Sequence, residues 1–348
     1  MASHRRPKQP SRARVSVLTA AAATAVALSA QVAAHAAPSP SPKKEDVKAQ
    51  IDQLQEEAEQ ATERYNGAKE RTDQLRKQAD QLQDQVARGQ EQMTQLQAGL
   101  AEVAGAQYRT GGIDPSVQLM LSSDPSGYLD KASSVQQASS SQTEALKGLQ
   151  DQQRRLDQQK AEAAAVLASL DTTTKDLNQS KAEVNKKLKE AQDLLNSLSA
   201  ADRAALKAAQ QQQERASRGG TERPDLGALP QASGMAGAAV ANAMAQQGKP
   251  YGWGSTGPNS FDCSGLMVWA YGKAGVSLPR TSQAQGNYGT RVPSLAEAQP
   301  GDLIIYRDDR SHVAMYIGNG MVVHAPRTGD VIKVMKADGM KINTIRRV

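Results

Sequence analysis

The chain of 348 residues contains one cysteine, one phenylalanine and two tryptophans, and aromatic residues make up only 3% of it. A single cysteine excludes any disulfide within the chain. In an exported protein, an odd cysteine indicates either an intermolecular bridge or a reactive thiol. Beyond the N-terminal region, the sequence has no apolar run long enough to span a bilayer. It also lacks the close C-x-x-C and H-E-x-x-H spacings that are typical of zinc sites.

The N-terminal region has the three-part order of a secretory signal peptide. Residues 5–14 carry five positive charges and no acid, an Ala-rich apolar run follows, and small residues surround Ala36. We therefore predict a signal peptide over 1–36 and a Pro/Ser-rich spacer over 37–44; a membrane anchor is the alternative. The predicted location is secreted, extracellular or associated with the cell wall. Removal of 1–36 lowers the formal net charge from +6 to about +1, which does not support a nucleic-acid partner.

A seven-residue repeat of small and apolar residues predicts a long coiled coil over 45–215. The repeat fails over 105–141, where glycines and prolines gather. Two helical arms joined by such a break most simply form an antiparallel hairpin, although an intermolecular coiled coil also fits the pattern. Gly, Pro and Ser then predict a linker over 216–233.

The last part of the chain, 234–348, contains both tryptophans, the only phenylalanine and five of the eight tyrosines. This segment is long enough to bury a core of its own. Two short helices are expected first, and short apolar runs bounded by turns follow, which predicts an α+β domain with an antiparallel sheet. The expected strands are Leu303–Tyr306, Val313–Ile317, Met321–His324, Val331–Met335 and Ile342–Val348.

Three residues of this domain are able to carry chemistry: Cys263, His312 and His324. Cys263 stands where a helix is expected to begin, and the helix dipole favours a thiolate there. His312 would act as its base, and His324, at the end of the next strand, would orient that ring. The alternatives are a small buried cysteine with two structural histidines, or a zinc site made of the same three side chains.

Four segments then carry a resemblance: "YGWGSTGPNSFDCSGLMVWAY", "LPRTSQAQ", "AQPGDLIIY" and "SHVAMYIGNGMVVHAP". Together they closely resemble the NlpC-type family of cell-wall cysteine peptidases. The resemblance implies a papain-like fold, Cys263 as nucleophile, His312 as base and His324 as orienting residue. It also implies that Tyr251, Asp262 and Ser264 line the substrate cleft, and that no cofactor is needed. One departure is Ser255, where the family often has a second glycine.

The resemblance further implies cleavage of peptidoglycan stem peptides at the γ-D-glutamyl–diaminopimelate bond. Asp262 would bind a free amino group of the stem peptide, or cap the helix. Family members with a similar coiled coil are secreted cell-separation enzymes, so the coiled coil is expected to regulate the enzyme or dock it on a division or wall-remodelling membrane complex; a plain spacer is the alternative. Two other functions stay open: a wall-binding protein without activity that recruits partners, and a thiol amidase or acyl transferase.

Overall fold

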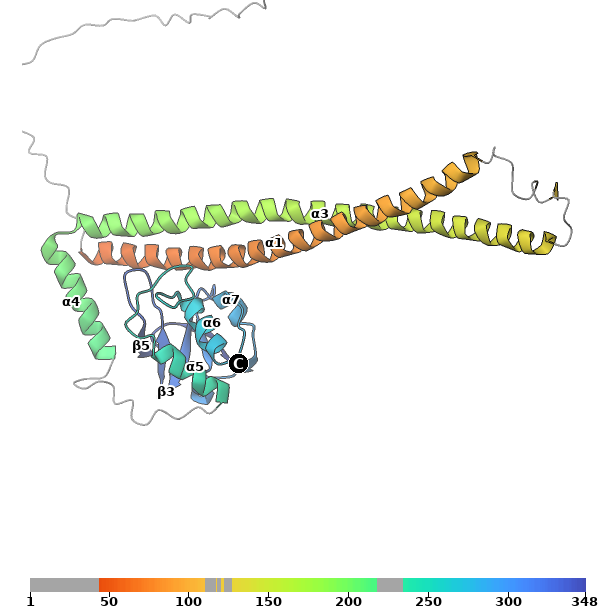
Figure 1. Ribbon diagram of the computed structural model, residues 1–348. Helices are drawn as coiled ribbons and strands as arrows, with labels where there is room; N and C mark the ends of the chain where they lie inside the picture. Colours follow the sequence, from red (N-terminus) through yellow and green to blue (C-terminus); the bar gives the residue numbers. More distant parts are fainter. Residues whose placement is uncertain (1–43, 110–116, 118–119, 122–126, 218–233) are drawn as a thin grey trace, which may run out of the picture. The chain divides into compact units, whose positions relative to one another are not determined.

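The structure is a computed structural model (Figure 1). It describes residues 44–109, 117, 120–121, 127–217 and 234–348. The predicted signal peptide, nearly all of the spacer and most of the predicted linker lie outside these residues. Within them, no helix combines the length and the hydropathy that crossing a membrane requires.

Two long helices, α1 (Lys44–Arg109) and α3 (Tyr128–Ser197), pack along one another (Figure 1). Polar contacts between them give their direction. Lys187 Nζ lies 2.6 Å from Glu57 Oε2 near the start of α1, and Gln152 Nε2 donates to the carbonyl oxygen of Gly89 farther along. The helices therefore run antiparallel, and the hairpin predicted from the heptads is confirmed.

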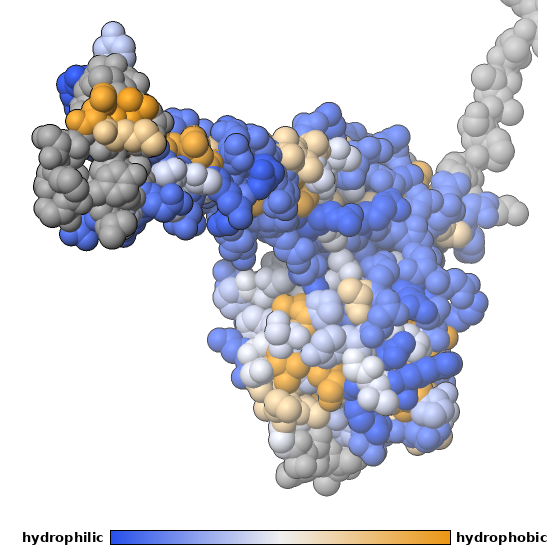
Figure 2. All heavy atoms as spheres, turned by 90° about the vertical axis from the view of Figure 1, so that its right-hand side faces the viewer, coloured by the Kyte–Doolittle hydropathy of each residue, from blue (hydrophilic) through white to orange (hydrophobic). Residues whose placement is uncertain are grey.

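Small and apolar side chains form the seam of this helix pair. The buried ones include Ala61, Leu82, Met93, Leu156 and Val184, each at most 7% exposed. A seven-residue repeat keeps these positions on the side that faces the partner helix. The outward positions are mostly charged or amide-bearing, and Figure 2 shows a largely hydrophilic surface on the face it presents.

The ends of the helices differ from the predicted ones. α1 extends to Arg109 and α3 begins at Tyr128, so both helices enter the predicted break at 105–141. The second arm is also interrupted: Leu198 has an extended backbone, and a separate helix α4 runs over Ala200–Ser217. Ser199 caps the start of α4, because its Oγ accepts from the backbone N–H of Asp202. The heptad repeat obscured this capping signal.

The C-terminal part begins with three helices, α5 (Gly234–Met244), α6 (Cys263–Lys273) and α7 (Ser282–Gln285). A short 3₁₀ turn, η1, covers Leu295–Glu297. The sheet has six antiparallel strands in the order β1-β6-β2-β3-β4-β5. Their bounds are Thr290–Val292 for β1, Leu303–Tyr306 for β2, His312–Gly318 for β3, Met321–His324 for β4, Lys333–Lys336 for β5 and Ile342–Arg347 for β6.

This α+β architecture confirms the predicted fold class, with the predicted strands in place and a short β1 added. Alternate residues of a strand point to opposite faces of the sheet, and each face packs into a core of its own. Leu303 and Ile305 of β2 join a core with α5 and α6, whereas Ile304 and Tyr306 join a second core under the 335–342 segment. Buried strands of this kind hold the residues at their ends in fixed positions.

Candidate active site

Cys263 is the first residue of α6, as predicted, and only 2% of it is exposed. Asp262 caps this helix: its Oδ1 accepts from the backbone N–H of Gly265 at 2.6 Å. Gly265 is required at its position, since a Cβ atom there would lie 2.2 Å from the carbonyl oxygen of Ser255. In the D-C-S-G sequence, the aspartate therefore caps the helix, and the glycine allows the start of the helix to pack closely against the preceding loop.

The β3–β4 hairpin brings the two predicted histidines together. The strands are joined by Asn319 and Gly320, which both have positive φ angles as a two-residue hairpin turn requires. His312 Nε2 lies 2.9 Å from His324 Nδ1, and both side chains are almost completely buried. His312 Nδ1 has no hydrogen-bond partner in the described part of the chain. This pairing leaves Nδ1 as the ring nitrogen available for proton transfer.

The thiol lies beside the start of β3. Cys263 Sγ is 3.9 Å from the carbonyl oxygen of Ser311, the residue before His312, and the backbone N–H of Val313 also contacts it. The structure thus gathers the three chemical residues at one end of the β3–β4 hairpin, against the first turn of α6.

The three predicted substrate-binding residues surround the thiol. Ser264 and Asp262 are both fully buried. Asp262 is held by Arg280, whose Nη2 lies 2.5 Å from Asp262 Oδ2, and Arg280 Nη1 also donates to Ser264 Oγ at 2.9 Å. Tyr251 is 8% exposed in the same core, and its hydroxyl pKa is raised by burial and by the nearby Cys263. Arg280 thus already compensates the Asp262 charge that was predicted to attract an amino group.

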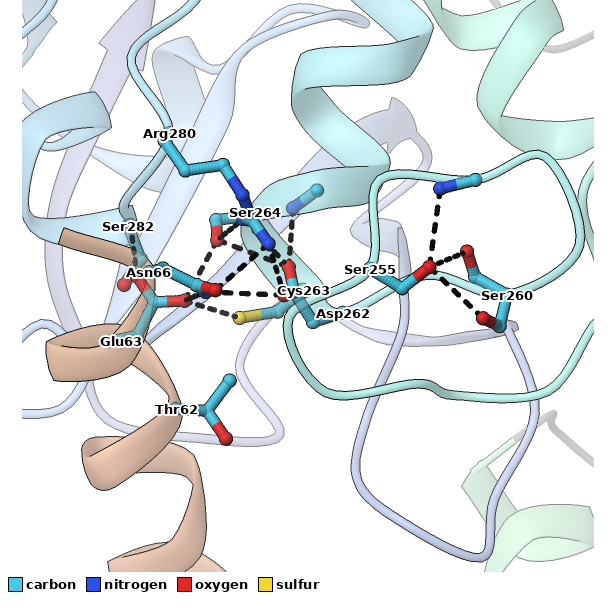
Figure 3. Close-up of polar contacts among 12 residues, drawn as sticks. Thr62, Glu63, Asn66, Ser255, Ser260, Asp262, Cys263, Ser264, Arg280 and Ser282 are labelled. Carbon is cyan, nitrogen blue, oxygen red and sulfur yellow. Dashed lines mark hydrogen bonds and ion pairs between the residues drawn. The ribbon is translucent and has the colours of Figure 1, made fainter. Parts of the chain in front are cut away.

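The long helix α1 also contributes residues to the site. Figure 3 shows Glu63 and Asn66 of α1 pointing at the start of α6. Glu63 Oε1 accepts from Ser264 Oγ at 2.8 Å and lies 3.7 Å from Cys263 Sγ, while Glu63 Oε2 accepts from the backbone N–H of Ser282 at 2.6 Å. The Glu63 carboxylate therefore occupies the space directly in front of the thiol.

One helical turn earlier, Glu59 faces the histidine. Glu59 Oε2 lies 3.6 Å from His312 Nδ1 and accepts a hydrogen bond from Arg307 Nη1. Arg307 also lies 3.5 Å from Glu56, and Arg327 donates to Asp52 at 2.8 Å. Together with Glu63, these acids of α1 follow one another at spacings of three and four residues, so the four lie on one side of the helix.

The same side of α1 makes an aromatic contact. The rings of Tyr65 and Trp253 lie edge to face with centroids 5.1 Å apart. Tyr65 stands at an apolar position of the seven-residue repeat, and the structure uses it in this contact with the C-terminal domain. A helix that has two buried sides cannot be read from one repeat alone.

Burial sets the protonation of the site in this arrangement. The pKa of the Cys263 thiol is raised well above its usual value by burial and by the Glu63 and Asp262 carboxylates. The pKa of His312 is lowered by burial, by His324 and by Arg307. From the sequence, the helix dipole was expected to favour a thiolate at Cys263. With α1 in place the reverse holds, because desolvation and three nearby acids outweigh the helix dipole.

The two acids of α1 are perturbed as well. Burial raises the pKa of Glu59 to about 7, against the opposing effect of Arg307. Burial and the Asp262 charge raise the pKa of Glu63 to about 7. Both carboxyl groups therefore bind protons more readily here than they would in water.

Ser255, the departure from the family pattern, has a structural role in its loop. Its Oγ donates to the carbonyl oxygen of Ser260 at 2.7 Å and accepts from Ser260 Oγ at 3.0 Å (Figure 3). These bonds fasten the segment whose Ser255 carbonyl packs on Gly265. The serine is therefore compatible with the same arrangement of the helix start.

Five residues of this site were not predicted from the sequence: Glu59, Glu63, Asn66, Arg280 and Arg307. Arg280 lies within the "LPRTSQAQ" motif, so the motif itself was the available signal. The α1 residues gave none, since acids on the outer side of a coiled coil normally face water. Among the described residues, no cluster of three or more His, Cys, Asp or Glu side chains is arranged to hold a metal ion.

Comparison with known proteins identifies the C-terminal domain. Residues 248–346 match the NlpC/P60 family, so the chain carries an NlpC/P60 domain, as its four motifs predicted. Proteins named "Probable endopeptidase" share it. One from Corynebacterium glutamicum is 44% identical over 110 residues, which is 32% of this chain and 52% of that protein. Endopeptidase p60 of Listeria monocytogenes, also named as probable, is 47% identical over 92 residues, 26% of this chain and 19% of that one.

Solved structures match the same domain. The P60 domain of an antigen from M. avium subspecies paratuberculosis is 33% identical, covers 32% of this chain and 93% of that chain, and has a TM-score of 0.31. An NlpC/P60 family protein from Bacillus cereus is 31% identical, with 34% and 41% coverage and a TM-score of 0.31. This chain spans about half the length of the Corynebacterium relative and less of the Listeria one.

Proposed function

We propose that this protein is an exported cysteine peptidase that hydrolyses peptidoglycan stem peptides at the γ-D-glutamyl–diaminopimelate bond. The observation that carries the proposal is the placement of Cys263, at a helix start, beside the buried His312–His324 pair within an NlpC/P60 domain. The endopeptidase names of the relatives support the reaction class.

The proposed reaction uses only side chains of this domain. His312 Nδ1 takes the thiol proton, and Cys263 Sγ attacks the amide carbonyl to form a tetrahedral oxyanion, which backbone N–H groups at the start of α6 stabilise. Protonated His312 then donates to the leaving amine and the carbon–nitrogen bond breaks, which leaves a thioester. Water, deprotonated by His312, attacks the thioester and releases the acid and the thiol.

We further propose that α1 holds the enzyme inactive. Glu63 fills the space in front of the thiol and Glu59 lies against His312 Nδ1, so substrate and α1 compete for the same space. The raised pKa of Cys263 and the lowered pKa of His312 disfavour the ion pair while α1 is bound. Release of α1 would rehydrate the site and favour the thiolate.

We propose that the coiled coil docks on a partner and that this binding releases α1. The candidate partner is a division or wall-remodelling membrane complex. Exposed apolar side chains near the ends of α1 and α3 support a contact there: Tyr108, Met120 and Leu121 are each more than 75% exposed. Apolar patches also interrupt the hydrophilic surface in Figure 2.

The experiment that tests the function is digestion of purified peptidoglycan, with products identified by mass spectrometry. The protein is the full chain without residues 1–36, carrying Glu59→Lys and Glu63→Lys; we call it the opened chain. We expect new termini at the D-glutamyl–diaminopimelate bond and at least about a 1,000-fold loss on adding Cys263→Ala. Wall binding by both proteins without cleavage would favour the non-enzymatic wall-binding alternative; a different cleaved amide would favour the amidase.

A further inference from the structure

Arg307 stands beside the catalytic histidine without a part in the proposed bond-breaking steps. It follows β2 and precedes His312 in the 307–311 loop. Its Nη1 donates to Glu59 and also to Ser311 Oγ at 3.2 Å, and its Nε lies 3.5 Å from Glu56. The guanidinium is thus held by two carboxylates that both belong to α1, and it loses both when α1 leaves.

The position of Glu59 indicates which part of a substrate Arg307 would meet. His312 Nε2 is engaged by His324, so Nδ1 must deliver the proton to the leaving amine. Glu59 Oε2 lies 3.6 Å from that Nδ1. The carboxylate that Arg307 binds therefore lies where the leaving residue would be, whereas Glu63, one helical turn away, lies 3.7 Å from the thiol.

The backbone of the loop supports a functional reason for this arginine. Arg307 has a φ of 67°, in the left-handed region that residues with a Cβ atom adopt at a cost. Its backbone N–H donates to the carbonyl oxygen of Lys341 at 2.8 Å, which holds this conformation. Strained positions of this kind gather at active sites, and of the two strained arginines in this loop only Arg307 contacts α1.

We infer that Arg307 is a specificity-determining residue that binds a carboxylate on the leaving-amine side of the scissile bond, and that Glu59 imitates this carboxylate when α1 covers the cleft. The inference rests on the proposed endopeptidase function and names the part of the substrate that it recognises. A leaving residue of the diaminopimelate type bears carboxyl groups, and arginine binds a carboxylate through paired, charge-assisted hydrogen bonds.

The test compares two synthetic tripeptides, L-alanyl-γ-D-glutamyl-diaminopimelate and the same peptide with its leaving-residue carboxylates converted to carboxamides. The opened chain should cleave the free acid with the higher kcat/KM. Arg307→Gln should lower kcat/KM for the free acid by about 10- to 100-fold and leave the carboxamide nearly unchanged, since one charge-assisted contact is lost. The loss should fall mainly on KM, and Arg307→Lys should restore part of the preference.

Arg310→Gln is the matched control. Arg310 lies in the same loop with a φ of 58°, but its guanidinium contacts Asn343 and Asn287 instead of α1. The opened chain with Arg310→Gln should keep the preference for the free-acid peptide over the carboxamide. Equal cleavage of both peptides by the opened chain, or an equal loss on both in Arg307→Gln, would overturn the inference while the endopeptidase function stands.

A second measurement separates this inference from failure of the function. If the opened chain cleaves neither peptide, the proposed function fails. Calorimetric binding to the opened chain with Cys263→Ala then decides the role of Arg307. Tighter binding of the free acid that disappears in Arg307→Gln supports the subsite, and equal or undetectable binding of both peptides rejects it.

Discussion

Helix α1 has two buried sides of opposite chemistry, and this difference bears on the proposed inhibition by α1. Toward α3 it buries Ala58 and Ala61, whereas toward the NlpC/P60 domain it buries Glu59, Glu63 and Asn66, to a similar degree. Apolar surface gains from staying out of water. Buried charges gain little over their hydrated state, because their desolvation offsets their pairing. The apolar contact with α3 is therefore suited to stay formed, and the polar contact with the NlpC/P60 domain is suited to dissociate.

The strongest way to break this comparison is to reverse the charge of the polar side. Glu59→Lys with Glu63→Lys places cations against Arg307 and Arg280, and the contact should open. We expect release of labelled wall fragments to rise by about 100-fold or more over the native chain, because breaking buried charge pairs costs several kcal/mol. Glu91→Lys, an exposed acid of the same helix, is the control. Equal activity of all three proteins would contradict inhibition by α1.

The apolar side is tested by a charge placed in the seam. Val184 of α3 is completely buried, so Val184→Asp should destabilise the helix pair by about 3 kcal/mol. Circular dichroism at helix wavelengths follows the helices, and tryptophan fluorescence follows the C-terminal domain, which contains both tryptophans. We expect only the helical transition to move down in temperature. A joint shift of both signals would mean that the two regions unfold as one unit.

The polar side should also respond to pH. Burial raises the pKa of Glu59 and of Glu63 from the ordinary value of 4.5 to about 7. The bound arrangement therefore takes up protons, and its stability from this source is fully present below about pH 4.5 and is lost as pH rises through about 7. Activity of the native chain relative to the opened chain should rise about tenfold per carboxyl from about pH 6 to about pH 8.

The opened chain serves as the reference because it carries the same Cys263 and His312, whose own titration cancels in the ratio. Other charged groups also act on the pKa of the two carboxyls; they are Asp262, Arg280, Arg307, Arg327 and Glu56. A ratio that falls with rising pH would contradict the direction of both pKa shifts.

The smallest effect is expected at the edge of the polar side. Tyr65→Ala removes the edge-to-face contact with Trp253, and such pairs contribute about 0.5–1.5 kcal/mol. Activity of the native chain should therefore rise by about threefold to tenfold. Tyr108→Ala is the control, because Tyr108 is 86% exposed. An unchanged rate in Tyr65→Ala would mean that only the charged residues of α1 hold it against the C-terminal domain.

Much of the architecture was accessible from local pattern. The heptads predicted the helix pair, because a repeat of 3.5 residues leaves one apolar side to bury. Alternation and turn residues predicted five of the six strands. The three-residue β1 carries too little pattern to be recognised, and it is defined only by its pairing with β6. The break at Leu198 was missed because the predicted coiled coil was continued through it to residue 215.

The sequence by itself determined which residues of the C-terminal domain come together: Cys263 at a helix start, His312 and His324 at the ends of a hairpin, and the acidic cap at Asp262. Each of these follows from short-range rules. Only the tertiary structure decided that Glu59 and Glu63 lie against the thiol and the imidazole, which are 200 residues or more away along the chain. Acids on the outer side of a coiled coil are equally compatible with water and with arginines, so the choice depends on which surface another part of the chain presents.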